Sequence, residues 1–285
     1  MKTPTLSSEI VIQPTRGWHF LAWKELWAYR DLLWLLVWRD FATRYKQTIL
    51  GPLWYIFQPL VTTFVFTIVF SRVAALPTDG LPPALFYLCG LLPWSYFAQT
   101  FASTSSTLTA NAGLFGKVYF PRLVVPLSAA ISNLAAFAVQ FLSFFVIFGL
   151  HRASHLEAAY GVRWQAVFLP VVLLQTCMLS LGVGLWIAAL TAKFRDFAVL
   201  AGFLIQLWMY ITPIIYPLAQ VPERWRVWVA LNPMTIPVEA FRFMLLGTGS
   251  LSLPTMAMSA AVTVLALLSG LLVFQRVEKN FVDVI

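Results

Sequence analysis

The most constraining feature of this sequence is the spacing of its charged side chains, which leaves six long intervals without any. Lys, Arg, Asp and Glu are absent from 47–71, 80–116, 123–151, 164–192, 197–222 and 243–275. A helix that rises ~1.5 Å per residue needs about 20 residues to cross a ~30 Å hydrocarbon core, and every interval is longer than that. A charge at the bilayer centre costs at least ~2.5 kcal/mol, so such intervals are expected in lipid. The sequence predicts an all-α, polytopic membrane protein with six transmembrane helices.

The composition agrees with a membrane protein. Only 11% of the residues are charged and 60% are hydrophobic, whereas a soluble domain usually carries about 25% charged residues. The formal net charge of +8 then reflects loops beside anionic lipid, and no nucleic-acid partner is expected. Cys89 and Cys177 both fall in charge-free intervals. We interpret them as small apolar side chains, and neither a disulfide nor a metal site is predicted.

Three regions are predicted along the chain. Residues 1–22 are polar and irregular, and we expect a cytoplasmic tail. Residues 23–46 carry a Trp-rich apolar face between basic side chains, which is typical of an amphipathic helix that lies in the membrane interface. The remainder, 47–285, is predicted to be the transmembrane domain. Its spans are expected at about 52–70, 85–101, 124–150, 166–190, 197–216 and 254–275.

The basic residues predict the orientation in the membrane. An even number of spans places both termini on one side. With the termini inside, the inner segments hold 13 of the 19 Lys and Arg residues and the outer segments hold the other six. Because basic residues are enriched on the cytoplasmic side, we expect a multi-pass protein of the cell inner (cytoplasmic) membrane with both termini in the cytoplasm.

The region between the fifth and sixth predicted spans is rich in proline, yet largely apolar. Residues 212–247 contain five prolines. Proline breaks a lipid-exposed helix, and broken backbone at membrane depth persists only where protein or a water-filled cavity shields it. We expect two short re-entrant helices, roughly 224–231 and 236–246, that form an outer gate; a folded external loop is the alternative. Glu239 and Arg242, three residues apart, are expected to pair and hold this gate. The candidate gate residues are Pro213, Tyr216, Pro217, Asn232, Pro233, Glu239 and Arg242.

Several kinds of chemistry are missing from the sequence. No G-x-x-x-x-G-K-S/T motif occurs, so the chain is not expected to bind ATP phosphates or to be an enzyme by itself. No H-E-x-x-H motif occurs either. Ionisable residues deep in the predicted spans, which ion-coupled transporters generally use, are also absent. These absences argue against a secondary transporter and an intramembrane hydrolase, and they favour energy supplied by a partner ATPase.

Six stretches, in order along the chain, carry a family resemblance. They are R-D-F-A-T-R-Y-K-Q-T-I-L-G-P-L-W at 39–54 with Gln58-Pro59, G-L-L-P-W at 90–94, N-A-G-L-F-G-K-V-Y-F-P-R at 111–122, F-R-D at 194–196, P-I-I-Y-P at 213–217 with L-N-P-M at 231–234, and E-K-N-F-V-D at 278–283. Together they resemble type-2 ABC permeases (ABC-2 type) of the polysaccharide export group, which includes O-antigen, capsule and teichoic-acid exporters.

The resemblance implies partners and a substrate. Permeases of this group are expected to form homodimers with two copies of a separate nucleotide-binding subunit, which binds the ATP and Mg²⁺, so that no cofactor is expected on this chain. The implied substrate is a polysaccharide carried on a lipid diphosphate. The resemblance also implies the interfacial N-terminal helix and the re-entrant gate helices that charge and proline placement predict independently.

Candidate residues for the substrate path are basic or aromatic. Arginine and lysine at the junction of the interfacial helix and the first span suit a diphosphate headgroup, and anionic lipid is an equally good interpretation. Aromatic faces suit sugars that must slide, although aromatic belts at the two interfaces also explain Trp and Tyr in membrane proteins. The candidates are Arg39, Arg44, Lys46, Trp54, Phe57, Phe64, Trp94, Tyr96, Phe97, Trp186, Trp208 and Tyr210.

Candidate residues for coupling to the ATPase lie in two cytoplasmic segments. The segment 111–122 alternates small, aromatic and basic residues, which suits a coupling helix in a groove of the ATPase; an ordinary solvated loop is the alternative. The turn 193–196 is a second candidate contact. The residues concerned are Asn111, Phe115, Lys117, Tyr119, Arg122, Lys193, Arg195 and Asp196.

Two other functions are compatible with a polytopic membrane protein. The first is an ABC-type exporter of drugs or small lipids, which the polysaccharide-type stretches disfavour. The second is a membrane enzyme that modifies glycans, which would need an acidic or histidine cluster at the membrane surface, and the sequence shows no such cluster.

Overall fold

The computed structural model describes residues 23–45, 51–154 and 160–280, and this part of the chain is helical and contains no strand. The helices in chain order are α1 (Trp23–Ala28), α2 (Arg30–Tyr45), α3 (Trp54–Phe66), α4 (Pro83–Ser105), α5 (Thr107–Ala110), α6 (Ala112–Phe115), α7 (Val124–Ser154), α8 (Leu169–Lys193), α9 (Asp196–Ile211), α10 (Glu223–Leu231), α11 (Thr235–Leu246) and α12 (Leu253–Asn280). A π-helical stretch, Thr67–Val73, extends α3, and a short 3₁₀ turn, Trp164–Phe168, precedes α8.

Four helical segments are long and apolar enough to cross a membrane. They coincide with the predicted first, third, fourth and sixth spans, and a fifth is added if the bent pair α10–α11 is taken as one span. The segments are Trp54–Val73, Val124–Ser154, Trp164–Lys193 and Leu253–Glu278.

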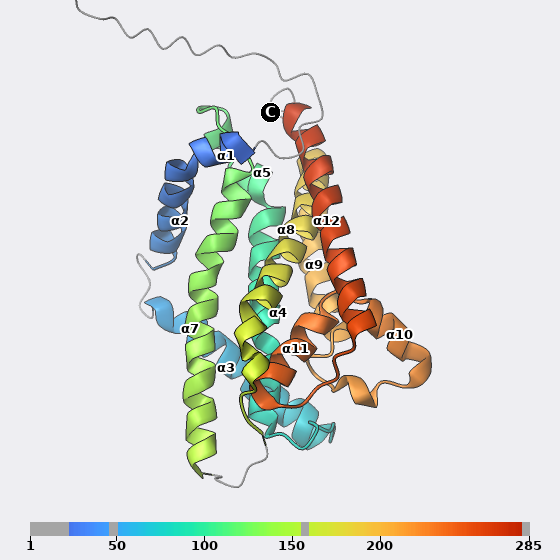
Figure 1. Ribbon diagram of the computed structural model, residues 1–285. Coiled ribbons are helices and arrows are strands. Elements are labelled where there is room, and N and C mark those ends of the chain that lie inside the picture. The colour runs from blue at the N-terminus through green and yellow to red at the C-terminus, as the bar shows by residue number, and fades with distance from the viewer. Residues whose placement is uncertain (1–22, 46–50, 155–159, 281–285) are drawn as a thin grey trace, which may run out of the picture.

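Helices also lie at the positions of the other two predicted spans, but with a different character. At the second position, α4 has 23 residues and 16 of them are buried, because α4 packs against α3, α7, α8, α9 and α11 in the middle of the bundle (Figure 1). At the fifth position, α9 is apolar but only 16 residues long. A central helix is shielded from lipid by its neighbours, so α4 tolerates polar side chains that a lipid-facing helix would not.

The helix α8 crosses its neighbours at unusually short range. A Cβ atom added to Gly182 would lie 2.5 Å from the backbone nitrogen of Leu267 in α12, and one added to Gly184 would lie 2.7 Å from Cβ of Thr104 in α4. Gly270 of α12 meets Gly182 at the same crossing. Small residues let transmembrane helices approach closely and gain van der Waals contact. These glycines therefore place α8 directly between α4 and α12.

The proline-rich region forms the two expected short helices, α10 and α11, which meet at 97°. They lie at the end of the bundle opposite α1 and α5 (Figure 1). Of the 12 residues in α11, 11 are buried, and the helix packs against α4 and α8. No residue of α10 is buried, and the helix projects from the side of the bundle (Figure 1). The region is thus a buried helix and an exposed helix joined by a sharp bend.

The N-terminal helices lie at the other end of the molecule. The helix α2 packs against α7 and descends beside it along the bundle (Figure 1). Its inward side chain Leu36 is buried in a cluster with Phe115, Phe120 and Phe274, whereas Trp27, Trp34 and Trp38 are exposed. The helical part of the prediction for 23–46 is therefore present, with its Trp-rich face directed away from the bundle.

We predict that Gly182→Ala lowers the thermal unfolding midpoint of the purified permease in detergent. The added methyl group would overlap the backbone of α12, and overpacking of this kind costs about 1–3 kcal/mol. Gly149→Ala, within helix α7, is the matched control, because no heavy atom lies within 4 Å of the added Cβ there. Equal midpoints for the two variants would show that the α8–α12 crossing is not as close as described.

Candidate functional site

At the bundle end that holds α10 and α11, the side chain of Arg242 binds the non-helical backbone that follows α9. Arg242 lies on α11 and is only 1% exposed. Its Nη1 donates to the carbonyl oxygen of Pro213 at 2.5 Å, and its Nη2 donates to that of Ile214 at 2.6 Å. These carbonyls follow the end of α9, where no helix supplies hydrogen-bond donors to them. The guanidinium group therefore satisfies backbone groups that the prolines leave open.

The charge of Arg242 is balanced inside the protein. Its Nη1 lies 3.2 Å from Oε1 of Glu239, and both side chains are buried. Glu239 Oε2 accepts the backbone N–H of Ser250 at 3.1 Å, and the guanidinium carbon of Arg242 lies 3.7 Å from the ring centroid of Phe86. A Cβ atom at Gly90 of α4 would lie 3.0 Å from Nη2 of Arg242. The expected Glu239–Arg242 pair is thus present and ties α11 to α4 and to the loop before α12.

Nearby, Asp79 lies in the loop between α3 and α4. Partial burial raises the pKa of its carboxyl group, and the positive charge of Arg242 offsets part of that rise.

The bend between α10 and α11 is held by Asn232. Its Oδ1 accepts from Nε1 of Trp208 at 2.8 Å and from the backbone N–H of Met234 at 3.0 Å. Its Nδ2 donates to Oγ1 of Thr212 at 2.9 Å. Oγ of Ser259 in α12 donates to the carbonyl oxygen of the next residue, Pro233, at 2.8 Å. One amide side chain therefore links the end of α9 to the bend, and one hydroxyl group links the bend to α12.

The other candidate gate residues lie in the segment between α9 and α10. Pro213 provides one of the carbonyls bound by Arg242. The hydroxyl group of Tyr216 donates to the carbonyl oxygen of Ile211 at 3.0 Å, and Pro217 precedes the short turn Leu218–Gln220. Of the predicted gate residues, Pro213, Glu239 and Arg242 are therefore joined to one another at α11. Asn232 and Pro233 form the bend before α11, and Tyr216 and Pro217 lie in the connection between α9 and α10.

A further arginine, which the sequence analysis did not single out, holds the C-terminal end of α11. Arg163 donates from Nη2 to the carbonyl oxygen of Gly247 at 2.6 Å, and its guanidinium carbon lies 4.3 Å from the ring centroid of Phe243. Gly247 ends α11 with φ of 81°, a left-handed conformation that favours glycine. In the sequence, Gly247 indicates where α11 ends, and the last carbonyl groups of a helix need hydrogen-bond donors from outside it. This is the signal that could have indicated a nearby basic side chain.

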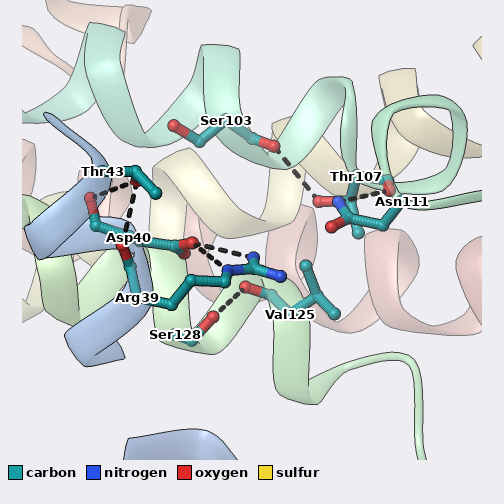
Figure 2. Close-up of polar contacts among 8 residues, drawn as sticks. All are labelled: Arg39, Asp40, Thr43, Ser103, Thr107, Asn111, Val125 and Ser128. Carbon is teal, nitrogen blue, oxygen red and sulfur yellow. Dashed lines mark hydrogen bonds and ion pairs between the residues drawn. The ribbon is translucent and has the colours of Figure 1, made fainter. Parts of the chain in front are cut away.

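At the opposite end of the bundle, only one of the three basic candidates at 39–46 has a described side chain. Arg39 donates from Nε and Nη2 to Oδ1 of Asp40 at 3.0 and 2.8 Å, and Thr43 Oγ1 donates to the carbonyl oxygen of Arg39 at 2.9 Å. Figure 2 shows this pair beside the first turns of α7, where Oγ of Ser128 donates a hydrogen bond to the carbonyl oxygen of Val125. The side chains of Arg44 and Lys46 lie outside the described residues. The charge of Arg39 is therefore already balanced by its neighbour.

The aromatic candidates for the substrate path separate into two groups. Trp94, Tyr96 and Phe97 are buried inside the bundle, where Phe97 packs edge-on against Trp208 at 5.0 Å between ring centroids. Trp208 is itself partly buried. The other five candidates are exposed on the outside of the protomer, namely Trp54, Phe57, Phe64, Trp186 and Tyr210. The structure therefore does not bring the nine aromatic candidates to one surface.

The segment 111–122 begins between the short helices α5 and α6 and lies at the same end of the bundle as α1 (Figure 1). Asn111 donates from Nδ2 to the carbonyl oxygen of Thr107 at 3.0 Å. Phe115 is buried, Lys117 is exposed, and Tyr119 is 80% exposed. Arg122 is only 8% exposed. One side of this segment is thus packed into the protein and the other is open.

The turn between α8 and α9 is also open. Lys193, Phe194, Arg195 and Asp196 are all exposed, and Nζ of Lys193 lies 5.3 Å from the ring centroid of Phe194. The turn and the segment 111–122 occupy the same end of the bundle (Figure 1). Two exposed surfaces that combine aromatic and basic side chains therefore lie at the same end of the bundle.

The model of one protein family, described as ABC-2 type transporter, matches residues 31–246. The chain belongs to the ABC-2 type transporter family. The match extends from α2 to the end of α11, and so includes both ends of the bundle. Membrane-spanning helices and this membership together make the chain a multi-pass membrane protein.

Relatives of known name also align with most of this ABC-2 family chain. It is 29% identical over 264 residues to the O-antigen export system permease protein RfbA of Myxococcus xanthus, with 91% of this chain and 97% of the relative covered. An RfbA of Klebsiella pneumoniae is 24% identical over 258 residues, which covers 90% and 95%. The polysialic acid transport protein KpsM of Escherichia coli is 24% identical over 213 residues, which covers 72% and 77%.

We predict that Arg242→Met lowers the thermal unfolding midpoint of this ABC-2 permease strongly, because it leaves Glu239 charged and unpaired in the interior. Loss of one partner from a buried ion pair costs about 3–5 kcal/mol. The double variant Glu239→Gln with Arg242→Met should recover part of the loss, but not all, since the carbonyls of Pro213 and Ile214 still lose their donors. Arg224→Met, on exposed α10, is the control. An Arg242→Met protein as stable as the control would contradict this description.

Proposed function

We propose that this chain is the transmembrane permease subunit of an ATP-binding cassette exporter that moves a polysaccharide across the cytoplasmic membrane. The observation that carries the proposal is alignment over nearly the whole length of relatives named for O-antigen export, 97% and 95% of those proteins. The alignment with a polysialic acid transport protein supports a polysaccharide as the class of substrate. A polymer linked to lipid diphosphate is the form that we propose.

The proposed topology has six spans, formed by α3, α4, α7, α8, α9 and α12. The central position of α4 explains how it crosses the membrane with a more polar sequence than its neighbours. An even number of spans would place α1 and the end of α12 on one side of the membrane, and their shared end of the bundle supports this (Figure 1). The excess of basic residues at this end makes it cytoplasmic. The exposed Trp-rich face of α2 then lies at the inner lipid interface.

The proposed partner is a separate ATP-binding subunit, present in two copies beside a homodimer of this chain. That subunit would bind the ATP and Mg²⁺ and hydrolyse the nucleotide. Its docking surface on this chain comprises Lys117, Val118 and Tyr119, together with Phe194 and Arg195 in the α8–α9 turn. Val118 is 55% exposed and Phe194 is exposed. Aromatic residues and arginine are enriched in protein interfaces, which supports Tyr119, Phe194 and Arg195 as contacts with the partner.

The proposed substrate path uses the exposed aromatic candidates, not the buried ones. Trp54, Phe57 and Phe64 recur on the outer face of α3, and Tyr210 is exposed on α9. A path between two protomers would be lined by such outward faces. Trp94, Tyr96 and Phe97 would support the path through packing only. Arg39 lies at the cytoplasmic end, where a lipid diphosphate would enter, and binding there would require it to exchange Asp40 for the phosphate.

The proposed outer closure is the pair α10–α11. The buried α11 is held by Arg242 and by Arg163, so it provides a fixed frame. The exposed α10 is connected to that frame through the bend at Asn232 and Pro233. In this arrangement α10 is the part that can change position when a polymer passes.

The direct test of the function is transport into inside-out membrane vesicles that contain this chain and its ATP-binding partner. We expect ATP-dependent uptake of lipid-linked polysaccharide isolated from the source strain, and no uptake with a partner unable to hydrolyse ATP. Fluorescent drugs and short-chain phospholipids serve as the competing substrates. Uptake of these small molecules without uptake of the polymer would refute the proposal and favour a drug or lipid exporter.

We also predict that Tyr119→Ala weakens binding of the ATP-binding subunit to the purified permease about tenfold or more, since a central aromatic residue in an interface typically contributes ~2 kcal/mol or more. Trp225→Ala is the matched control, because Trp225 is an exposed aromatic residue of α10 at the opposite end of the bundle. Surface plasmon resonance measures both affinities. If the two variants bind equally well, the docking surface lies elsewhere.

A further inference from the structure

The exposed docking side chains are joined to the last helix through Arg122. Nη1 of Arg122 donates to the carbonyl oxygen of Glu278 at 2.7 Å, and the backbone N–H of Arg122 donates to Oε1 of Glu278 at 3.3 Å. The last carbonyls of a helix have no partner within the helix, and the negative end of the helix dipole favours a cation there. Arg122 therefore caps the C-terminal end of α12 with its side chain, while Tyr119, three residues earlier, is exposed.

Packing makes this connection stiff. Phe115 and Phe120 lie on the inner side of the segment 111–122 with their ring centroids 5.6 Å apart, and the guanidinium carbon of Arg122 lies 5.4 Å from the centroid of Phe115. Both rings belong to one buried cluster with Phe274 of α12, which is fully buried. Close-packed interiors transmit displacement and do not absorb it. The packing of Phe115, Phe120 and Arg122 therefore connects the segment 111–122 rigidly to the end of α12.

The other end of α12 contacts the bend between α10 and α11. Ser259 is 1% exposed, and its Oγ donates to the carbonyl oxygen of Pro233 at 2.8 Å while it accepts from Nε2 of Gln175 at 2.8 Å. Between the two ends, α12 crosses α8 at Gly182 and Gly270. This crossing, where backbone meets backbone, can act as a pivot. One continuous helix therefore touches the cytoplasmic docking segment and the opposite end of the bundle.

We propose that α12 transmits movement from the ATPase-docking segment to α10–α11, with Arg122 and Ser259 as the positioning residues at its two ends. The inference rests on the proposed function, because it needs a partner ATPase at Tyr119 and an outer closure at α10–α11. Helix shifts of about 1–2 Å are a common form of such transitions. Such transmission requires energetic coupling between the two ends of α12 and not proximity alone.

The test measures ATP hydrolysed per polymer exported by the complete complex reconstituted in vesicles. Arg122→Met and Ser259→Ala should each raise this ratio roughly fivefold or more, the lower range of allosteric coupling, with binding of the ATPase subunit unchanged. Arg276→Met is the matched control, because it removes the same charge from an exposed position of α12 within one turn of Glu278 and should leave the ratio unchanged. Arg122→Lys, which keeps a cationic donor, should restore part of the coupling.

The double variant Arg122→Met with Ser259→Ala tests whether the two residues act through the same connection, helix α12, or through two independent ones. If both residues act through α12, the double variant should be no worse than the more severe single variant, since either change already interrupts the same connection. Losses that multiply in the double variant would overturn the proposal, as would wild-type ratios in both single variants. Should Arg122→Met fail to assemble, Ser259→Ala, a minimal change at the far end, decides the question alone.

The outcome is distinguishable from failure of the proposed function. A wild-type complex that exports no polysaccharide would refute the function itself. A wild-type complex that exports polysaccharide, with Arg122 and Ser259 variants that remain fully coupled, would leave the function intact and refute only the role of α12.

Discussion

The structure depends on arginine side chains that satisfy backbone carbonyls where helices break or end. Arg242 binds the carbonyls of Pro213 and Ile214, Arg163 binds that of Gly247, and Arg122 binds that of Glu278. Inside the bundle, water is not available to the carbonyls of Pro213 and Ile214, and an unsatisfied polar group there costs several kcal/mol. Each guanidinium group offers five donors in a rigid plane, so a single side chain can satisfy more than one carbonyl. The irregular segments of this permease are possible because these arginines are present.

The same interactions divide the molecule into fixed and free parts. Helix α11 is buried on 11 of its 12 residues and held from two sides, whereas α10, beyond the bend at Asn232, has no buried residue. At the other end, Arg122 faces α12 while Tyr119 faces outward. In both places a tightly bound element stands directly beside an exposed one. That juxtaposition is what an ATP-driven permease requires, since a rigid element must carry movement between a partner and a part that responds.

Much of this arrangement follows from the sequence by simple physics. The charge-free intervals place helices where the structure has them, because the cost of a charge in lipid acts on each residue separately. The five prolines of 212–247 correctly predict two short helices, and the three-residue spacing of Glu239 and Arg242 correctly predicts their contact. These features are local, and a local pattern can be recognised without knowledge of the rest of the fold.

What the sequence does not give are contacts between residues far apart. The hydrogen-bond partners of Arg122 and Arg163 are 156 and 84 residues away in the sequence. No local sequence pattern near either arginine identifies these partners. The aromatic candidates show the same limit, because Phe97 and Phe57 have similar surroundings in sequence, yet one is buried and the other exposed. The central place of α4 explains its moderate polarity only after its neighbours are known.

The central claim is that the docking segment and α10 lie on opposite faces of the membrane, and thiol labelling in intact cells tests it most directly. Single cysteines would be introduced as Tyr119→Cys and Trp225→Cys in a protein with Cys89 and Cys177 replaced by alanine. The account predicts that a membrane-impermeant maleimide labels Trp225→Cys once the outer membrane is opened, and labels Tyr119→Cys only after the inner membrane is also disrupted. Labelling of both positions under the same condition would contradict it.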